Sequence, residues 1–203
     1  MKGRESGMPD EDCWSSFFDA DGLVDLLVSP ASTQGDIVEM GTGYGTFTIP
    51  TARRITGTLH GFDIEPELIE LVRERCHQLG IENVQLETRD FVIEGTGLPD
   101  ASVAHVMIYN LLHIEHPVEL LKEAFRILKP GGSVSVIHWR RDIPTPRGPS
   151  MDIRPSPEQC AQWGSQAGFH KIKTEDITAA APYHFGMILH KVGPVIKIID
   201  YTH

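Results

Sequence analysis

The strongest constraint on the fold is a regular alternation of short apolar segments with longer amphipathic segments. The short segments are rich in β-branched and other apolar residues and predict buried strands at 36–40, 59–62, 84–87, 103–109 and 133–137. The segments at 66–79 and 117–128 place apolar residues on one face of a helix. Strands that alternate with helices need right-handed crossovers and form a mainly parallel sheet covered on both faces. The predicted fold class is therefore α/β and doubly wound.

Further elements are expected along the rest of the chain, with helices at 14–28, 46–55 and 156–167 and strands at 169–174 and 183–190. These two strands bring the expected sheet to seven. We expect the first helical segment to break near Gly22 and to end before Pro30. Residues 1–12 are polar and charged, which predicts a disordered end followed by one domain over 13–203.

The composition excludes several classes of protein. With 40% hydrophobic and 23% charged residues, the chain has the balance of a soluble globular domain. Its net charge of -10 opposes general binding to nucleic-acid phosphates. The sequence has neither an apolar segment of the roughly 18 residues that cross a bilayer nor the apolar start of a secretory signal. We therefore expect a cytoplasmic protein with no nucleic-acid or membrane partner, whose three distant cysteines are free thiols.

A glycine-rich turn follows the first predicted strand, and ligands of doubly wound sheets bind beyond such strand ends. Gly41, Gly43 and Gly45 alternate with larger residues and let the backbone approach a ligand closely. A plain turn is the structural alternative, and Glu39 two positions before the first glycine favours a ligand. A dinucleotide fingerprint would need a small residue where the chain has Thr46, and the Gly-Lys pair of a phosphate-binding loop is missing.

Two carboxylates follow the next two strands. Asp63 ends the second strand, where a carboxylate accepts hydrogen bonds from ribose hydroxyls and repels a phosphate. Asp90 follows the third strand and is placed to accept from an exocyclic amine, with Ile64 or Phe91 packed on the base. The plain alternatives are a helix cap for Asp63 and a solvated loop residue for Asp90. Together the two carboxylates indicate a nucleoside with a free ribose.

These residues carry a resemblance to a known family. The chain resembles class I S-adenosylmethionine-dependent methyltransferases, in order from about 36 to 138, through Glu39-x-Gly41-x-Gly43-x-Gly45, Asp63, Arg89-Asp90, Leu-Pro-Asp-Ala-Ser at 98–102 and Leu-Lys-Pro-Gly-Gly at 128–132. The resemblance implies a Rossmann-like sheet of seven strands with an antiparallel last strand. It also implies S-adenosylmethionine as the cofactor and S-adenosylhomocysteine as the product.

The resemblance further implies roles for individual residues. Glu39 and the three glycines would line the methionine end of the cofactor. Asp63 would hold the ribose, Ile64 would flank the adenine, and Asp90 would accept from the adenine amino group. Asn110, after the fourth strand, would lie beside the sulfonium and the methyl acceptor.

Methyl transfer is an in-line displacement, so the protein has to exclude water, align the acceptor and, for some acceptors, remove a proton. The catalytic candidates at the strand ends are Tyr109 and His113, with His138 as a substrate contact. His113 is the preferred base, because an imidazole with its ordinary pKa of about 6.5 is mostly neutral at pH 7. A buried histidine bonded to the backbone is the alternative. No metal is expected, because His105 and His116 lie too far from His113 along the fold to converge on one ion.

The segment 140–157 is unusual, because it holds four arginines against two aspartates in an acidic protein, together with five prolines. It leaves the sheet at the expected ligand edge, and its prolines reduce its freedom. We expect it to form an ordered wall of the acceptor site, with Arg147 and Arg154 facing an anionic group of the substrate. The alternative is that these arginines pair with the protein's own carboxylates.

The function predicted from the sequence is methyl transfer from S-adenosylmethionine to a small-molecule acceptor. An NAD-dependent oxidoreductase is the main alternative, and Thr46 and Asp90 count against it. A second alternative is a catalytically inactive module that binds S-adenosylmethionine. A nucleic-acid or protein methyltransferase is a third, disfavoured by the acidic charge and by the lack of an Asn-Pro-Pro-Tyr sequence after the fourth strand. The apolar segment 195–200 is a candidate edge strand or homodimer contact.

Overall fold

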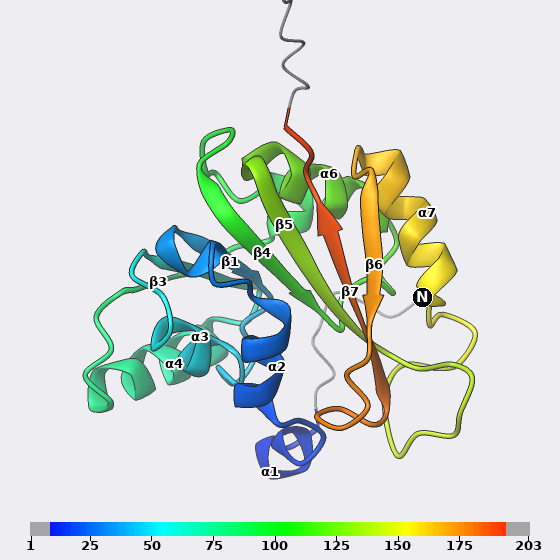
Figure 1. Ribbon diagram of the computed structural model, residues 1–203. Coiled ribbons are helices and arrows are strands. Elements are labelled where there is room, and N and C mark those ends of the chain that lie inside the picture. The colour runs from blue at the N-terminus through cyan, green and yellow to red at the C-terminus, as the bar shows by residue number, and fades with distance from the viewer. Residues whose placement is uncertain (1–8, 194–203) are drawn as a thin grey trace, which may run out of the picture.

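A twisted sheet of seven strands organises residues 9–193, the part of the chain that the computed structural model describes (Figure 1). The strands are β1 (Ile37–Met40), β2 (Leu59–Asp63), β3 (Val84–Thr88), β4 (Val103–Tyr109), β5 (Leu128–Trp139), β6 (Lys171–Glu175) and β7 (His184–His190). Their order in the sheet is β3-β2-β1-β4-β5-β7-β6. Strands β1 to β5 pair in parallel, and β7 runs antiparallel to both β5 and β6. The predicted fold class, with its antiparallel last strand, is confirmed.

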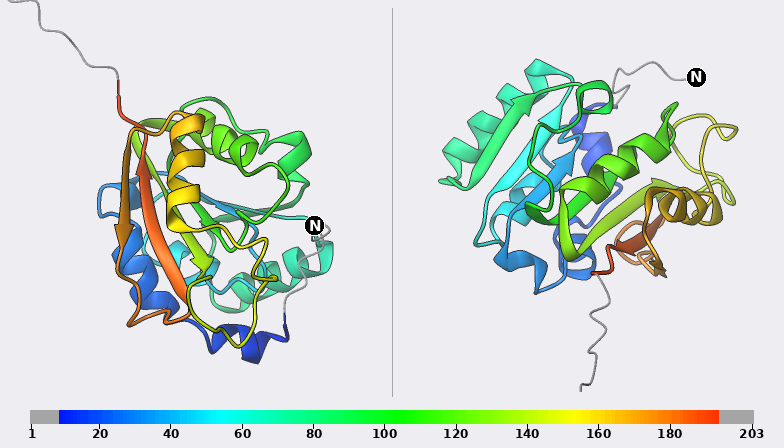
Figure 2. Two further views of the ribbon diagram at one scale, coloured as in Figure 1. Left: turned by 90° about the vertical axis from the view of Figure 1, so that its right-hand side faces the viewer. Right: turned by 90° about the horizontal axis from the view of Figure 1, so that it is seen from above.

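Helices cover both faces of this sheet (Figure 2). They are α1 (Glu11–Ser15), α2 (Ala20–Leu27), α3 (Thr48–Ala52), α4 (Pro66–Gln78), α5 (Phe91–Glu94), α6 (Pro117–Ile127) and α7 (Pro157–Ala167), with a 3-10 turn at Ser32–Gln34. Helices α6 and α7 pack on each other over one face, and α2 and α3 pack together over the other. Helix α4 lies against β2 and β3.

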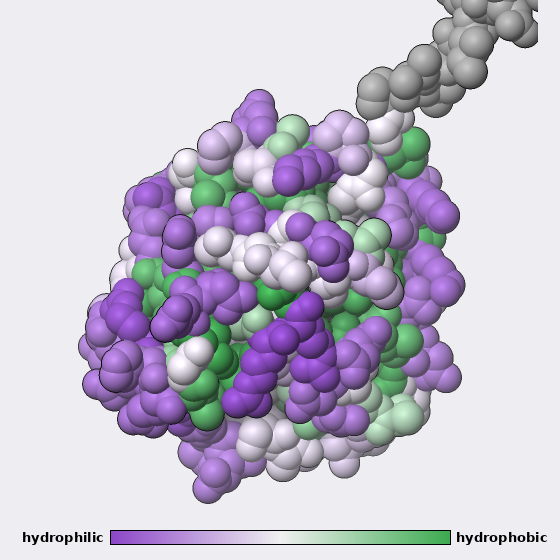
Figure 3. Space-filling view, turned by 60° about the vertical axis from the view of Figure 1, so that its left-hand side comes forward, coloured by the Kyte–Doolittle hydropathy of each residue, from purple (hydrophilic) through white to green (hydrophobic). Residues whose placement is uncertain are grey.

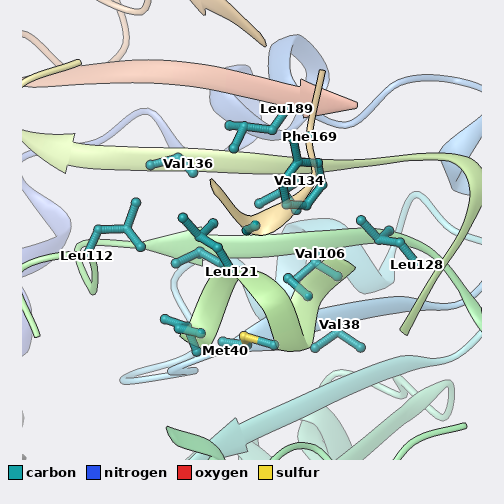
Figure 4. Close-up of a cluster of buried hydrophobic side chains, with 14 of the residues drawn as sticks. Val38, Met40, Val106, Leu112, Leu121, Leu128, Val134, Val136, Phe169 and Leu189 are labelled. Carbon is teal, nitrogen blue, oxygen red and sulfur yellow. The ribbon is translucent and has the colours of Figure 1, made fainter. Parts of the chain in front are cut away.

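The core is divided by the sheet because side chains along a strand alternate between its faces. Val38, Val106 and Val136 belong to the cluster under α6 and α7 (Figure 4). Ile37 and Met107 point the other way, into the cluster under α2 and α3. Both clusters are fully buried, so they fix the register of the central strands and with it the relative heights of the strand ends. Polar residues predominate on the outer face shown in Figure 3.

Helix α7 shows why the sequence signals for helix ends succeeded. Ser156 accepts a hydrogen bond from the Gln159 backbone N–H at 3.3 Å, and the Gln159 side chain accepts from the Ser156 N–H at 2.9 Å. This capping box sets the start, with Pro157 in the first turn. Gly168 ends the helix in the left-handed conformation that favours glycine.

Two differences from the expected elements concern the N-terminal region. Helix α2 is not broken at Gly22, because Asp19 caps the helix and accepts from the Gly22 N–H at 3.0 Å; the break lies at residues 16–19. The end expected to be disordered, 1–12, includes the first turn of α1, where Asp10 accepts from the Cys13 N–H. Residues 1–8, like the segment 195–200, lie outside the described residues. In the described part, no helix has the length and apolar character needed to span a membrane.

Two further differences lie near strand ends. Strand β5 begins at Leu128, directly after α6, so the turn expected at 129–132 is part of the strand. Asp90 caps the short helix α5, which was not expected because four residues are too few to show a helical period. Helix α3 is also shorter than the stretch expected at 46–55.

A partly buried carboxylate ties the segment before β4 to α6. Glu123 accepts hydrogen bonds from the backbone N–H and the hydroxyl of Thr96, at 2.7 and 2.6 Å, and from Arg126 at 2.8 Å. Burial by itself raises the pKa of Glu123, but the hydrogen bonds from Arg126 and Thr96 outweigh burial and lower the pKa to about 2. The ionised form is therefore favoured in the folded protein.

This carboxylate makes the stability depend on pH. Because the folded pKa lies below the ordinary value of 4.5, the stabilisation is complete above pH 4.5 and is lost as the pH falls towards 2. We expect Glu123→Gln to lower the free energy of unfolding by about 1–3 kcal/mol at pH 7, and by less with decreasing pH. Urea unfolding at several pH values measures this. Glu119→Gln, which removes an exposed pair with Lys122 on the same helix, is the control; an equal loss in both variants would contradict the prediction.

Candidate functional site

A cavity of about 200 Å³ lies at the carboxyl ends of the parallel strands. The predicted site residues that line it are Gly41, Gly43, Asp63, Ile64, Asp90, Phe91, Tyr109, Asn110, His113 and Arg147. They come from the ends of β1 to β4 and from the loop 140–156. Glu39, Gly45, His138 and Arg154 do not line the cavity. The strand ends thus gather most of the predicted residues, as the fold class requires.

The glycine turn after β1 is fastened to the end of β2. The Gly43 N–H donates to Asp63 Oδ2 at 2.8 Å, and the Gly41 N–H donates to the Phe62 carbonyl at 2.8 Å. Gly43 and Gly45 have φ angles of 51° and 81°, which favour glycine. A Cβ on Gly45 would lie 3.1 Å from Val72 of α4, so Gly45 serves helix packing and not the cavity, contrary to its predicted role.

Asp63 combines the two roles considered for it. Its carboxylate lines the cavity, and its Oδ1 accepts from the Glu65 N–H at 3.1 Å just before α4 begins. Burial raises the pKa of Asp63, against the lowering effect of the backbone N–H groups of Gly43 and Glu65. The side chain is therefore held rigidly at the edge of the cavity.

Glu39 lies behind the cavity, contrary to the role that the family resemblance implied. The alternation along β1 turns its side chain towards α3, where the Thr48 hydroxyl donates to Glu39 Oε2 at 2.5 Å. Burial raises the pKa of Glu39 to about 8. Burial therefore favours the protonated form of the group, and Glu39 joins β1 to α3.

Asp90 and its neighbours form the end of the cavity beside β3. Asp90 Oδ1 accepts from the Ile93 N–H at 3.2 Å, so the residue caps α5 as well as lining the cavity. Phe91 is buried, and Ile64 on the opposite loop is partly exposed. The apolar side chains of Ile64 and Phe91 and the carboxylate of Asp90 therefore lie at the same end of the cavity, as expected for a site that binds a nucleobase.

Asn110 is the most informative residue of the cavity. It follows β4 with a φ of 56°, which is unusual for a residue other than glycine. Both polar atoms of its side chain are buried, and neither has a hydrogen-bond partner among the residues that the structure describes. An unsatisfied buried polar group costs about 1–3 kcal/mol, so this amide is a candidate for contact with a ligand.

The three candidates for chemistry at the acceptor end differ in their surroundings. Tyr109 lines the cavity, its hydroxyl is hydrogen-bonded to Ser135 at 2.8 Å, and burial raises the pKa of Tyr109, which makes it a less suitable base than the sequence indicated. His113 lines the cavity. His138 is fully buried behind it, so the predicted substrate contact from His138 is wrong; its Nε2 lies 3.2 Å from His113 Nδ1.

Aromatic residues that the sequence did not single out complete the wall. Trp14 of α1, Phe47 before α3 and Trp139 at the end of β5 all line the cavity. Figure 1 shows α1 (blue) and the loop 140–156 (yellow-green) at the same edge of the sheet. An isolated tryptophan looks the same in a sequence whether it serves a core or a site. The run of aromatic residues at 14–18 was the one available signal.

The loop 140–153 is held in shape by Arg154. This guanidinium is 5% exposed, and it donates to the carbonyls of Arg140, Arg147 and Pro149 and to the Thr145 hydroxyl, at 2.7 to 3.0 Å. Gly148, with a φ of 113°, leaves room for it, because a Cβ there would lie 2.8 Å from Arg154. Arg154 is therefore a structural residue and not the substrate residue that we expected.

Two other arginines of this loop were expected either to face the substrate or to pair with the protein's own carboxylates, and they differ in their surroundings. Arg140 pairs with Asp142 at 2.6 Å, as the alternative reading of the segment proposed. Arg147 is exposed and lines the cavity. Within residues 9–193, no cluster of histidine, cysteine or carboxylate side chains is arranged to hold a metal ion.

Comparisons with known proteins show which proteins the chain is similar to. Residues 37–132 match the family model described as a methyltransferase domain. The chain is 31% identical over 116 residues to aklanonic acid methyltransferase DauC of Streptomyces sp. (strain C5), which covers 56% of this chain and 51% of that protein. It is 29% identical over 105 residues to demethylmenaquinone methyltransferase of Tropheryma whipplei (strain Twist), covering 51% and 41%. The chain thus spans about half the length of the curated relatives it matches.

Solved structures share the fold over nearly the whole chain. A SAM dependent methyltransferase from Aquifex aeolicus superposes with a TM-score of 0.73 at 20% identity, covering 90% of this chain and 94% of that one. Geranyl diphosphate C-methyltransferase from Streptomyces coelicolor A3(2) gives 0.70 at 16% identity, covering 85% and 78%. The chain therefore has the fold of the class I S-adenosylmethionine-dependent methyltransferases that the sequence motifs resemble, and residues 37–132 match a methyltransferase domain.

The role of Arg154 predicts a loss of stability on substitution. Arg154→Met leaves three backbone carbonyls without their donor, and we expect the free energy of unfolding to fall by about 2–4 kcal/mol. Cleavage within 140–153 in limited proteolysis should become faster. Chemical unfolding and mass spectrometry of the fragments measure the two effects. Arg141→Met, at an exposed arginine of the same loop, is the control, and equal stability of the two variants would refute the assignment.

Proposed function

We propose that the protein transfers a methyl group from S-adenosylmethionine to a small-molecule acceptor. The observation that carries the proposal is the buried, unsatisfied amide of Asn110, which shares one cavity with Asp63 and the glycine turn. A polar group in such a position gains a partner only when a ligand enters. Small-molecule acceptors also appear in the names of two relatives, aklanonic acid and demethylmenaquinone.

The residues of the cavity fit the parts of this cofactor. The Asp63 carboxylate has acceptor capacity beyond its two backbone hydrogen bonds, and we assign it to the ribose hydroxyls. Ile64 and Phe91 are proposed to flank the adenine, with Asp90 accepting from the adenine amino group. Asn110 and the backbone at Gly41 and Gly43 are assigned to the methionine end.

The acceptor is proposed to occupy the aromatic part of the cavity. The cofactor supplies a methyl group on a positively charged sulfur, which needs an aligned nucleophile in a site free of water. Trp14, Phe47 and Trp139 provide an apolar wall that excludes water and orients a flat or aliphatic acceptor. Arg147 stands at the exposed side of this wall, where a guanidinium favours an acceptor with an anionic group.

The cofactor assignment is tested by calorimetry with S-adenosylhomocysteine. We expect Asp63→Ala to weaken binding about 10- to 100-fold, because hydrogen bonds to a carboxylate are worth about 1.5–3 kcal/mol. Asp176→Asn is the matched control, since Asp176 also accepts from a backbone N–H but lies outside the cavity. Circular dichroism establishes that both variants are folded. Equal affinity in the two variants would contradict the ribose assignment.

The same calorimetry separates the rival functions. Tight binding of NAD in place of S-adenosylhomocysteine would favour an oxidoreductase. Tight binding of S-adenosylhomocysteine, with no transfer of label from methyl-labelled donor to any component of a cell extract, would favour a binding module without catalysis. Transfer of label to a small molecule is the result that the proposal requires.

The role of Arg147 is tested on the labelled acceptor. If this acceptor is anionic, we expect Arg147→Met to raise its KM about 10-fold or more, because a charge-assisted hydrogen bond is lost. Affinity for S-adenosylhomocysteine should stay unchanged. Arg141→Met is the control, because Arg141 belongs to the same loop and does not line the cavity. An unchanged KM in Arg147→Met would remove Arg147 from the acceptor site.

A further inference from the structure

Two histidines form a contact at the acceptor end of the cavity. His113, after β4, lines the cavity, and its Nδ1 lies 3.2 Å from Nε2 of His138 on β5. The two rings are 5.4 Å apart at 72° to each other. His138 is fully buried, and its second nitrogen, Nδ1, lies 3.3 Å from the carbonyl oxygen of Trp139. The three groups form one chain from the interior of the sheet to the cavity.

The carbonyl oxygen of Trp139 determines which ring nitrogen of each histidine carries a hydrogen. A carbonyl oxygen can only accept, so Nδ1 of His138 carries the hydrogen. Burial lowers the pKa of His138 to about 3, with a further lowering from His113, so the ring is neutral and its Nε2 is an acceptor. Nδ1 of His113 must then carry a hydrogen to donate to it. In neutral His113 the lone pair is left on Nε2.

We propose that His113 is the general base of the transfer, held with its lone pair on Nε2 by the positioning residue His138, and that the acceptor is a phenolic or enolic hydroxyl on a flat apolar molecule. This inference rests on the proposed function and specifies its substrate class. Tyr109, whose hydroxyl is bound to Ser135, offers no competing base.

The strength of this base selects the class of acceptor. A histidine backed by a carboxylate becomes more basic, whereas His113 is backed by a neutral imidazole. His184 and Arg154 also lower the pKa of His138, so a positive charge on that ring is disfavoured. An imidazole can take the proton of a phenol, whose pKa of about 10 is like that of tyrosine, more readily than that of the far less acidic aliphatic alcohol.

The remaining charged groups and the shape of the cavity agree with this class. Arg89, Arg147, Asp63 and Asp90 share the cavity with His113, two of each sign, so the formal charges of these four lining residues cancel. The aromatic wall described above suits the face of a ring. An aromatic hydroxyl seated there would present its O–H towards the imidazole.

The reaction moves one proton and one methyl group. The hydroxyl proton of the acceptor passes to Nε2 of His113, and an electron pair of the oxygen forms the new O–CH₃ bond. The S–CH₃ bond of the donor breaks, with its electron pair returning to sulfur. The positive charge of the sulfonium is thereby replaced by that of an imidazolium, which then releases its proton to water.

The proton order is tested without any substrate. Two-dimensional ¹H–¹⁵N spectra of histidine rings distinguish the two neutral forms and the cation. At pH 8, in the presence of S-adenosylhomocysteine, we expect both His113 and His138 in the Nδ1–H form. In His138→Leu, the signal of His113 should shift to a mixture of the two neutral forms, and His138→Gln, whose amide oxygen can accept, should restore it. An Nε2–H form of His113 in the unsubstituted protein would overturn the proposal.

The base and the acceptor class are tested with a series of phenols of graded pKa, together with an aliphatic alcohol, an amine and a thiol, and labelled donor. We expect transfer to phenols, and a fall in kcat of about 10²- to 10⁴-fold at pH 7 in His113→Gln with little change in KM. In that variant the rate should instead rise with pH in proportion to the phenolate. His116→Gln, an exposed histidine of the same loop outside the cavity, is the control.

The outcomes are distinct from those for the proposed function. If the unsubstituted protein does not bind S-adenosylhomocysteine, the proposed function itself is wrong. Intact binding with no transfer to any phenol, or transfer to the amine or thiol alone, would overturn the acceptor class. Transfer to phenols with an unchanged kcat in His113→Gln would overturn the role of His113.

Discussion

The hydrogen bond from the Gly43 N–H to the Asp63 carboxylate is the contact on which the site depends. It joins the turn after β1 to the end of β2, so two loops from neighbouring parallel strands act as one rigid edge. The register of β1 and β2, fixed by buried residues on both faces of the sheet, brings the two groups to the same height. The cavity exists because this edge stands opposite Asn110 at the end of β4.

Much of the fold and of the cofactor end could be predicted from the sequence, because the signals there are local. Strand period, helix caps and the glycine turn are each written within a few residues, and carboxyl ends of parallel strands meet wherever such a sheet forms. Side chains whose partners are distant were less predictable. Glu39 turns towards Thr48 of α3, and Arg154 folds back on carbonyls of its own loop, and neither partner is marked by a motif.

The two ends of the cavity are thus formed by different parts of the fold. The proposed cofactor end is made by polar groups at strand ends, whose positions the sheet determines. The proposed acceptor end is made by α1, by the loop 140–153 and by the pair of His113 and His138, and its aromatic wall was found only in the three-dimensional structure. This division explains why the sequence indicated a class of chemistry but named no acceptor.

The way in which Arg154 organises its loop has a consequence for how such a protein can diversify. Three of the four groups that it binds are main-chain carbonyls, which every amino acid provides. The path of the loop is therefore nearly independent of the side chains that it carries, apart from Thr145 and Gly148. Arg147 itself, whose side chain takes no part in this framework, can therefore be exchanged in evolution or in the laboratory on a constant scaffold, so new selectivity can arise without rebuilding the protein.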